Sequence, residues 1–171
     1  MRESFFPASS PGDYEAFAVL VSEYLGWCRS RYQHDVRFVE QVFGHQELDQ
    51  ELRQLATTYG PPQGTTLLVR CDDQIVAGGA FRRLPDGSCE MKRLYVSERF
   101  KGRGIGRRLA DALINAARSD GYRLIRLDTG SLMTEAIDMY RKLGFRDCAP
   151  HCDYPETLLP YLVFMELPLR R

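Results

Sequence analysis

Apolar residues recur at helical spacing through the first third of the chain. The segment Ser10-Pro11-Gly12-Asp13 is typical of a helix start, with Ser10 as the cap and Pro11 in the first turn. Apolar positions then follow three or four residues apart, at Phe17, Leu20, Val21, Tyr24 and Cys28. A second helical stretch is predicted over residues 35–58, with a break near Gly44, and the glycines and prolines of residues 59–64 end it. We therefore expect an N-terminal helical pair.

The middle of the chain changes to strand-like patterns. Residues 65–70, 74–81 and 88–96 are apolar and partly β-branched, and the turn signals Asp72-Asp73 and Asp86-Gly87 separate them. Gly78-Gly79 inside the second strand predicts a bulge or a close approach of backbone. These three segments are expected to form an antiparallel meander.

Helix and strand patterns alternate in the last third. One helical face begins at Ile105 and ends at Asp120-Gly121, and residues 123–127 form a strand expected to lie parallel to residues 88–96. A helix over residues 134–143 stops at Gly144, and residues 161–167 form a last strand. The predicted class is α/β (α+β), with a central mixed, mostly antiparallel sheet flanked by helices.

Length and composition narrow the picture. The 171 residues predict one domain over 1–171, with a mainly helical portion over 1–64 and a sheet-based core over 65–167. A hydrophobic fraction of 44% and a charged fraction of 27% are typical of a globular protein, and the formal net charge of zero argues against a nucleic-acid or membrane-surface partner. No apolar run approaches the ~18 residues that a membrane span needs, and no signal-peptide core is evident, so we expect a cytoplasmic protein.

The five cysteines are odd in number and mostly scattered, which favours reduced thiols. Cys148, His151 and Cys152 lie close together and raise the possibility of a metal site. Because no second pair of ligands is evident elsewhere, an incidental cluster is the better interpretation. No metal is therefore expected.

The segment from Arg99 to Arg108 is the richest in chemistry. It joins a strand to a helix and contains three glycines, which let the backbone turn tightly and approach a ligand. Amide groups at a helix N-terminus favour an anion, and the arginines and Lys101 add full positive charges. The segment predicts a phosphate cradle.

Three known phosphate-binding patterns compete for this segment. A P-loop requires Gly-Lys-Ser/Thr, whereas Gly106 is followed by Arg107-Arg108. The Rossmann pattern would place its third glycine at Arg107, and a large side chain there would obstruct helix–strand packing. The third pattern fits best, because Lys101-Gly102-Arg103-Gly104-Ile105-Gly106 resembles motif A of the GNAT superfamily of N-acetyltransferases.

The resemblance implies a GNAT fold and acetyl-CoA as co-substrate. The amides of residues 101–106 would hold the CoA pyrophosphate, and the backbone of residues 94–96 would pair with the pantetheine arm, although those three residues could equally be ordinary strand core. The residues assigned in this way to acetyl-CoA binding are Leu94, Tyr95, Val96, Lys101, Gly102, Arg103, Gly104, Ile105, Gly106 and Arg107.

A second family signature supports the first. The segment from Ala136 to Phe145 is similar to the family's A-x-x-x-Y-x-x-x-G-F box, which makes Tyr140 the candidate proton donor to the CoA sulfur. Met133 stands where the family often has an asparagine, so one contact with the cofactor is expected to be missing. A core tyrosine is the alternative for Tyr140.

The resemblance also points to Glu90 as the candidate general base, because histone-acetylating members carry a glutamate at this offset from motif A. The alternative is a strand glutamate paired with Arg82, Lys92 or Arg93. Asp128 could orient the acceptor amine or end a strand as a turn residue, and the turn is slightly favoured. Possible lining residues of the acceptor site, each more often a packing or surface residue, are Glu23, Trp27, Tyr32, Glu40 and Phe43.

The resemblance implies an N-acetyltransferase that moves an acetyl group from acetyl-CoA to a primary amine of a small molecule or peptide, by direct attack in a ternary complex. The alternative is a non-catalytic acyl-CoA-binding or regulatory module. Nucleic-acid contact through the basic loop is a weaker idea, since aromatic residues do not alternate with the charges. GNAT proteins often form homodimers.

Overall fold

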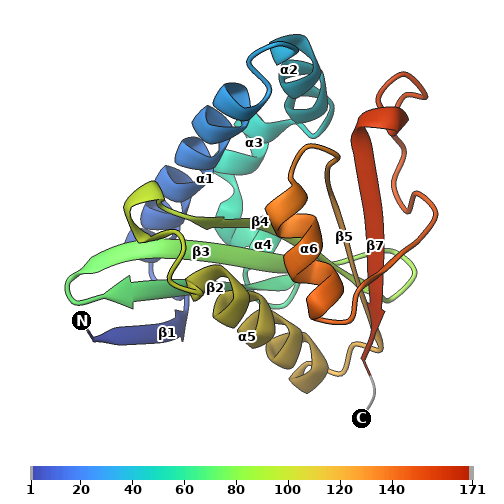
Figure 1. Cartoon of the computed structure of the whole chain (residues 1–171). Coiled ribbons are helices and arrows are strands. Elements are labelled where there is room, and N and C mark those ends of the chain that lie inside the picture. Colours follow the sequence, from blue (N-terminus) through green and yellow to red (C-terminus); the bar gives the residue numbers. More distant parts are fainter. Residues whose placement is uncertain (1, 170–171) are drawn as a thin grey trace.

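Seven strands form one mixed sheet in residues 2–169, the part of the chain that the computed structural model describes, with the side chain of His45 excepted (Figure 1). The strand order is β1-β2-β3-β4-β5-β7-β6, and only the β4–β5 pair is parallel. The strands are β1 (Glu3–Pro7), β2 (Gly64–Cys71), β3 (Gln74–Arg83), β4 (Cys89–Val96), β5 (Leu124–Gly130), β6 (Arg146–Asp147) and β7 (Leu162–Pro168). The predicted α/β class and the parallel crossover are confirmed.

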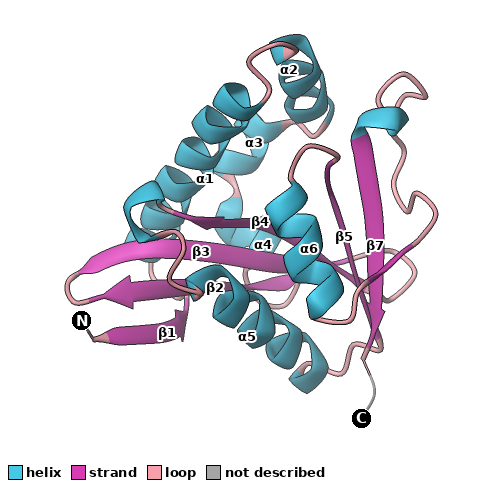
Figure 2. Cartoon of the chain, viewed as in Figure 1, coloured by secondary structure: helices cyan, strands magenta, loops and turns pink. Residues whose placement is uncertain are grey.

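Helices lie on both faces of this sheet (Figure 2). They are α1 (Pro11–Arg31), α2 (Val36–His45), α3 (Leu48–Arg53), α4 (Leu55–Tyr59), α5 (Ile105–Ser119) and α6 (Thr134–Lys142), with short 3₁₀ turns η1 (Glu98–Phe100) and η2 (Leu159–Tyr161). Helix α1 begins as expected, because the Ser10 side chain accepts a hydrogen bond from the Asp13 amide and the Asp13 side chain accepts one from the Ser10 amide. The stretch predicted over residues 35–58 is divided into α2, α3 and α4.

Gly78 and Gly79 of β3 face opposite sides of the sheet. A Cβ atom on Gly78 would lie 2.9 Å from Phe17 and 3.1 Å from Leu20 of α1, whereas one on Gly79 would lie 3.0 Å from Leu113 of α5. Since successive strand residues point to opposite faces, α1 and α5 pack on opposite sides of the sheet. Both helices approach the backbone of β3 too closely for a larger residue at either position.

The expected bulge lies between β3 and β4. Gly78 pairs with Tyr95 and Ala80 pairs with Lys92, so that Gly79 alone faces two residues of β4. One of these two, Arg93, has a φ of 59°. The bulge redirects the end of β4 just before the glycine-rich loop.

Two strands were missing from the sequence-based prediction. The N-terminal portion was expected to be mainly helical, but β1 pairs with β2 at one edge of the sheet, and the two-residue β6 pairs with β7 at the other. Both are short edge strands that depend on a partner distant in the sequence. None of the helices in residues 2–169 combines the length and apolar character needed to cross a bilayer.

Candidate active site

The parallel strands β4 and β5 separate after a short contact. Their pairing in the described residues is limited to Cys89 with Ile125 and Glu90 with Arg126, although both strands continue. The main chain of Leu94–Val96 therefore has no strand partner on the β5 side. A cleft of about 730 Å³ begins here, and its walls come from α1, α2, β4, β5, α6 and the glycine-rich loop.

The glycine-rich loop closes one end of the cleft. Gly102 and Gly104 have φ angles of 77° and 73°, a region that glycine occupies without strain, and Gly104 is the N-cap of α5. The first amides of a 15-residue helix thus lie beside the cleft and favour an anion. The loop residues that line it are Lys101, Gly102, Gly104, Ile105, Gly106 and Arg107.

One of two side chains near the loop lies differently from the expectation. The Arg103 guanidinium carbon lies 5.3 Å from the centre of the Phe100 ring, and Arg103 is not among the residues that line the cleft. Trp27, named above as a possible lining residue of the acceptor site, lines the cleft beside the glycine-rich loop, and the Lys101 ammonium lies 4.0 Å from the centre of its ring.

Tyr140 lies on α6 and lines the middle of the cleft. Its ring packs edge-to-face against Phe145, with centroids 5.5 Å apart, and no hydrogen bond joins its hydroxyl to another described residue. Burial, with a contribution from Asp128, holds the pKa of this hydroxyl well above its usual value. Tyr140 therefore keeps its proton at neutral pH.

Glu90 lies in a buried ion-pair network beside the cleft. One carboxylate oxygen accepts two hydrogen bonds of 3.2 Å from Arg82, and the other lies 3.2 Å from His151 Nε2 and 3.5 Å from Lys92 Nζ. Burial would raise its pKa, but Lys92, His151 and Arg82 outweigh burial and hold the pKa well below its usual range. This is the arrangement of the alternative, a paired strand glutamate, and it does not suit a base that must take up a proton.

Asp128 takes the place in the cleft that was expected for Glu90. It lies within β5 and not in a turn, so the turn interpretation is wrong. Its carboxylate lines the cleft, accepts a hydrogen bond of 2.9 Å from Lys92 Nζ and accepts another of 3.1 Å from the Tyr154 hydroxyl. Asp128 thus presents its carboxyl group to the cleft.

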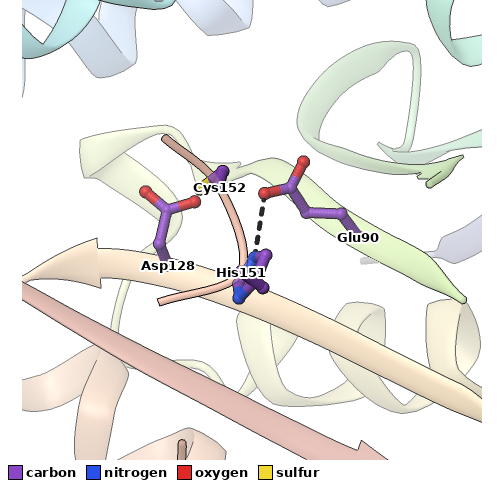
Figure 3. A group of neighbouring side chains, drawn as sticks. All are labelled: Glu90, Asp128, His151 and Cys152. Atoms are coloured by element: carbon purple, nitrogen blue, oxygen red, sulfur yellow. Dashed lines mark hydrogen bonds and ion pairs between the residues drawn. The ribbon is translucent and has the colours of Figure 1, made fainter. Parts of the chain in front are cut away.

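Glu90, Asp128, His151 and Cys152 come together as Figure 3 shows, with one potential metal-ligand atom of each within 4.8 Å of the others. The structure thus supplies the second pair of ligands that the sequence did not reveal. However, Lys92 Nζ contacts both carboxylates, and its positive charge would repel a metal ion. Burial and the two carboxylates raise the pKa of the Cys152 thiol to about 12, which keeps it protonated. The group fits an ion-pair network centred on lysine better than a metal centre.

The acceptor candidates from the N-terminal helices divide into two sets. Trp27, Tyr32 and Phe43 line the cleft. Glu23 instead accepts a hydrogen bond from Ser97, and Glu40 pairs with Arg29. Sequence reasoning did not identify Gln46 and Tyr154, because no motif surrounds either residue.

Comparisons with known proteins agree with this geometry. The sequence model of the Acetyltransferase (GNAT) family matches residues 20–145. An uncharacterized N-acetyltransferase of Schizosaccharomyces pombe is 32% identical, and the match covers 94% of this chain and 91% of that protein. The IAA acetyltransferase of Azospirillum brasilense is 34% identical, and the match covers 66% of this chain and 72% of that protein. The structure of the PaiA N-acetyltransferase of Thermoplasma acidophilum, in complex with coenzyme A, superimposes with a TM-score of 0.70 and 16% identity over 98% and 99% of the two chains.

Proposed function

The chain belongs to the acetyltransferase (GNAT) family, and from this premise we propose that it transfers an acetyl group from acetyl-CoA to a primary amine of a small molecule or peptide. One observation carries the proposal. The cleft where β4 and β5 separate has a helix-terminal glycine loop at one end and brings Tyr140 and Asp128 to its middle. An anion site, an open strand edge, a proton donor and a carboxyl group thus line one cavity.

The residues of the cleft fit acetyl-CoA. The amides at the start of α5, with Lys101 and Arg107 beside them, suit the negatively charged pyrophosphate. The open main chain of Leu94–Val96 offers N–H and C=O groups to the amide-containing pantetheine arm. In this placement the thioester lies near Tyr140 and Asp128.

The acceptor nitrogen must lose two protons in the transfer, and the departing sulfur must gain one. Asp128 holds the acceptor as an ammonium ion and takes up one proton, directly or through water, so that the nitrogen lone pair becomes free. The nitrogen then attacks the thioester carbonyl carbon and the carbon–sulfur bond breaks. The departing sulfur receives the proton of the Tyr140 hydroxyl, and the nitrogen, now bonded to the acetyl carbon, releases its second proton to solvent. Tyr140 then regains a proton from solvent.

Glu90 has a positioning role in this proposal. Its carboxylate holds Lys92 from one side while Asp128 holds it from the other, so Glu90 acts on Asp128 through the lysine. Asp128 and not Glu90 has the direct base role in this proposal, because the pKa of Glu90 is lowered and Glu90 does not line the cleft.

Release of CoA with a panel of primary amines tests the activity. Tyr140→Phe is expected to lower kcat about 100-fold, as for loss of a general acid. The KM for acetyl-CoA should change little. Tyr122→Phe is the matched control, because Tyr122 is a buried tyrosine that packs on Phe81 and does not line the cleft. Tight acetyl-CoA binding without turnover of any amine or peptide would instead favour a non-catalytic acyl-CoA-binding module.

A further inference from the structure

A chain of hydrogen bonds connects α2 to the middle of the cleft. The Tyr154 hydroxyl donates to Asp128, and the side-chain amide of Gln46 donates to the oxygen of that hydroxyl. A tyrosine hydroxyl has one hydrogen, and here it goes to Asp128. Gln46 must therefore present its NH₂ group to Tyr154, and its carbonyl oxygen is directed elsewhere.

That carbonyl oxygen has an unsatisfied hydrogen-bonding capacity. Gln46 Oε1 is buried and has no hydrogen-bond partner among the described residues. An unpaired buried acceptor is costly and uncommon in a native protein, so it calls for a donor. Gln46 and Asp128 both line the cleft. The Gln46 carbonyl oxygen has almost no surface open to it in this structure, so it accepts a hydrogen bond from a bound amine once the side chain turns toward the cleft.

A primary amine matches this pair of acceptors. After it loses one proton, the ammonium group of the acceptor still has two N–H bonds and a lone pair. One N–H can be donated to Asp128 and the other to Gln46. The lone pair then remains free for attack on the thioester.

The wall around these two acceptors is apolar. The residues that line this part of the cleft, here named the acceptor end, include Tyr32, Phe38, Val42, Phe43, Met133 and Leu162. Two of the rings, Tyr32 and Phe38, pack together with centroids 5.1 Å apart. Such a wall stabilises an aromatic or aliphatic body by removing it from water.

Three cations that line the cleft near the acceptor end already have partners inside the protein. Lys92 pairs with Asp128 at 2.9 Å, Arg93 with Glu51 at 2.7 Å and Arg31 with Glu135 at 2.6 Å. A carboxylate or phosphate on the acceptor would meet no unpaired cation among these three, and burial of an unpaired charge is costly. The acceptor should carry its only charge on the amine.

We propose that the acceptor is a primary amine on an apolar body, aromatic or aliphatic, without an acidic group, held by the Gln46 carbonyl oxygen and the Asp128 carboxylate. This inference rests on the proposed acetyl transfer and adds the chemical class of the acceptor and Gln46 as a binding residue.

Three amines separate the possible classes in the wild-type protein. 2-Phenylethylamine has the proposed form, phenylalanine adds a carboxylate to the same skeleton, and spermidine lacks the ring and adds charges. We expect kcat/KM for 2-phenylethylamine to exceed that of either competitor at least about tenfold, because an unpaired buried charge costs more than the 1.4 kcal/mol that a factor of ten represents. Equal or higher kcat/KM for phenylalanine or spermidine would overturn the inference and leave acetyl transfer standing.

Gln46→Ala tests the binding residue. Loss of one hydrogen bond is expected to raise the KM for 2-phenylethylamine about five- to tenfold, with the KM for acetyl-CoA unchanged. Gln50→Ala is the matched control, because Gln50 is an exposed glutamine on α3 that does not line the cleft. An unchanged amine KM in a folded Gln46→Ala variant contradicts the assignment.

Calorimetric titration of 2-phenylethylamine into protein saturated with CoA separates the two proposals. Binding that Gln46→Ala weakens, in the absence of turnover, would support the acceptor site and contradict the enzymatic activity. Turnover of other amines without 2-phenylethylamine binding would support the enzymatic activity and contradict the proposed acceptor site.

Discussion

Two carboxylates on neighbouring strands have opposite surroundings. Glu90 and Asp128 both contact Lys92, but Glu90 also contacts Arg82 and His151, whereas Asp128 lines the cleft. These extra partners hold the pKa of Glu90 well below its usual range and occupy its oxygens. Asp128 can therefore act on a substrate in the cleft, whereas Glu90 can act only through Lys92.

Substitution of each carboxylate by its amide separates the two roles. We expect Asp128→Asn to lower kcat/KM for the amine about 100-fold, because the group that accepts the proton is lost. Glu90→Gln should lower it less than about tenfold, since that residue acts only through Lys92, and should mainly lower the melting temperature. Asp111→Asn, an exposed change on α5, is the control. A larger loss of turnover in a folded Glu90→Gln variant than in Asp128→Asn would return the base role to Glu90.

At the scale of elements, the bulged end of β4, the glycine loop and the start of α5 act as one unit. The bulge opposite Gly79 redirects β4, and Gly102 and Gly104 reverse the chain so that the α5 amides face the cleft. The loop needs glycine because both φ values lie in the left-handed region. This part of the site depends on backbone conformation more than on side chains.

Gly102→Ala and Gly87→Ala form a matched pair that isolates this effect. Both glycines have a left-handed φ, 77° and 82°, and neither has an atom within 4 Å of the added Cβ. Each variant should lose about 1 kcal/mol of unfolding free energy from strain. Only Gly102→Ala, in the cleft, should raise the KM for acetyl-CoA severalfold, whereas Gly87 lies in the β3–β4 turn. An equal KM in the two variants would argue against a loop that binds the cofactor.

At the scale of the whole molecule, buried ion pairs join segments that are distant in sequence. Arg93 on β4 donates two hydrogen bonds, of 2.7 and 3.0 Å, to Glu51 on α3, and Glu90 connects β4 with β3 and with His151 near the C-terminus. Breaking such a pair leaves a buried charge without compensation. The sheet, the N-terminal helices and the C-terminal loop thus depend on the same charges.

Stability should fall in acid for this reason. Burial would raise the pKa of Glu51, but Arg93 outweighs it, and the pKa of Glu90 is lowered as well. A carboxyl group whose pKa is lower in the folded protein stabilises it fully above the unfolded value and loses that contribution as the pH falls. We expect the urea midpoint to fall progressively below about pH 4.5.

Glu51→Gln provides the check on this acid dependence. It should cost about 3 kcal/mol at pH 7, because Arg93 is left buried and unpaired, and the fall in the urea midpoint below pH 4.5 should become smaller. A midpoint that does not change between pH 6 and pH 3 in the wild-type protein would contradict this account.

Much of the fold and part of the site could be predicted from short segments. The α1 cap, the β-meander, the Gly102–Gly106 loop and the Ala136–Phe145 box are local patterns, and their interactions lie within a few residues of one another. Strands β1 and β6 are different, because such short strands exist only through distant partners.

The direction in which each acidic side chain faces could not be predicted. The separation of β4 from β5 placed Asp128 in the cleft and Glu90 behind Lys92, and chain folding joined Gln46 to Tyr154 across 108 residues. Local patterns set which residues are helical, extended or able to bind phosphate, because those properties arise from near neighbours in the chain. Proton transfer and acceptor binding depend on atoms a few ångströms apart in space, and only the packed sheet brings those atoms together.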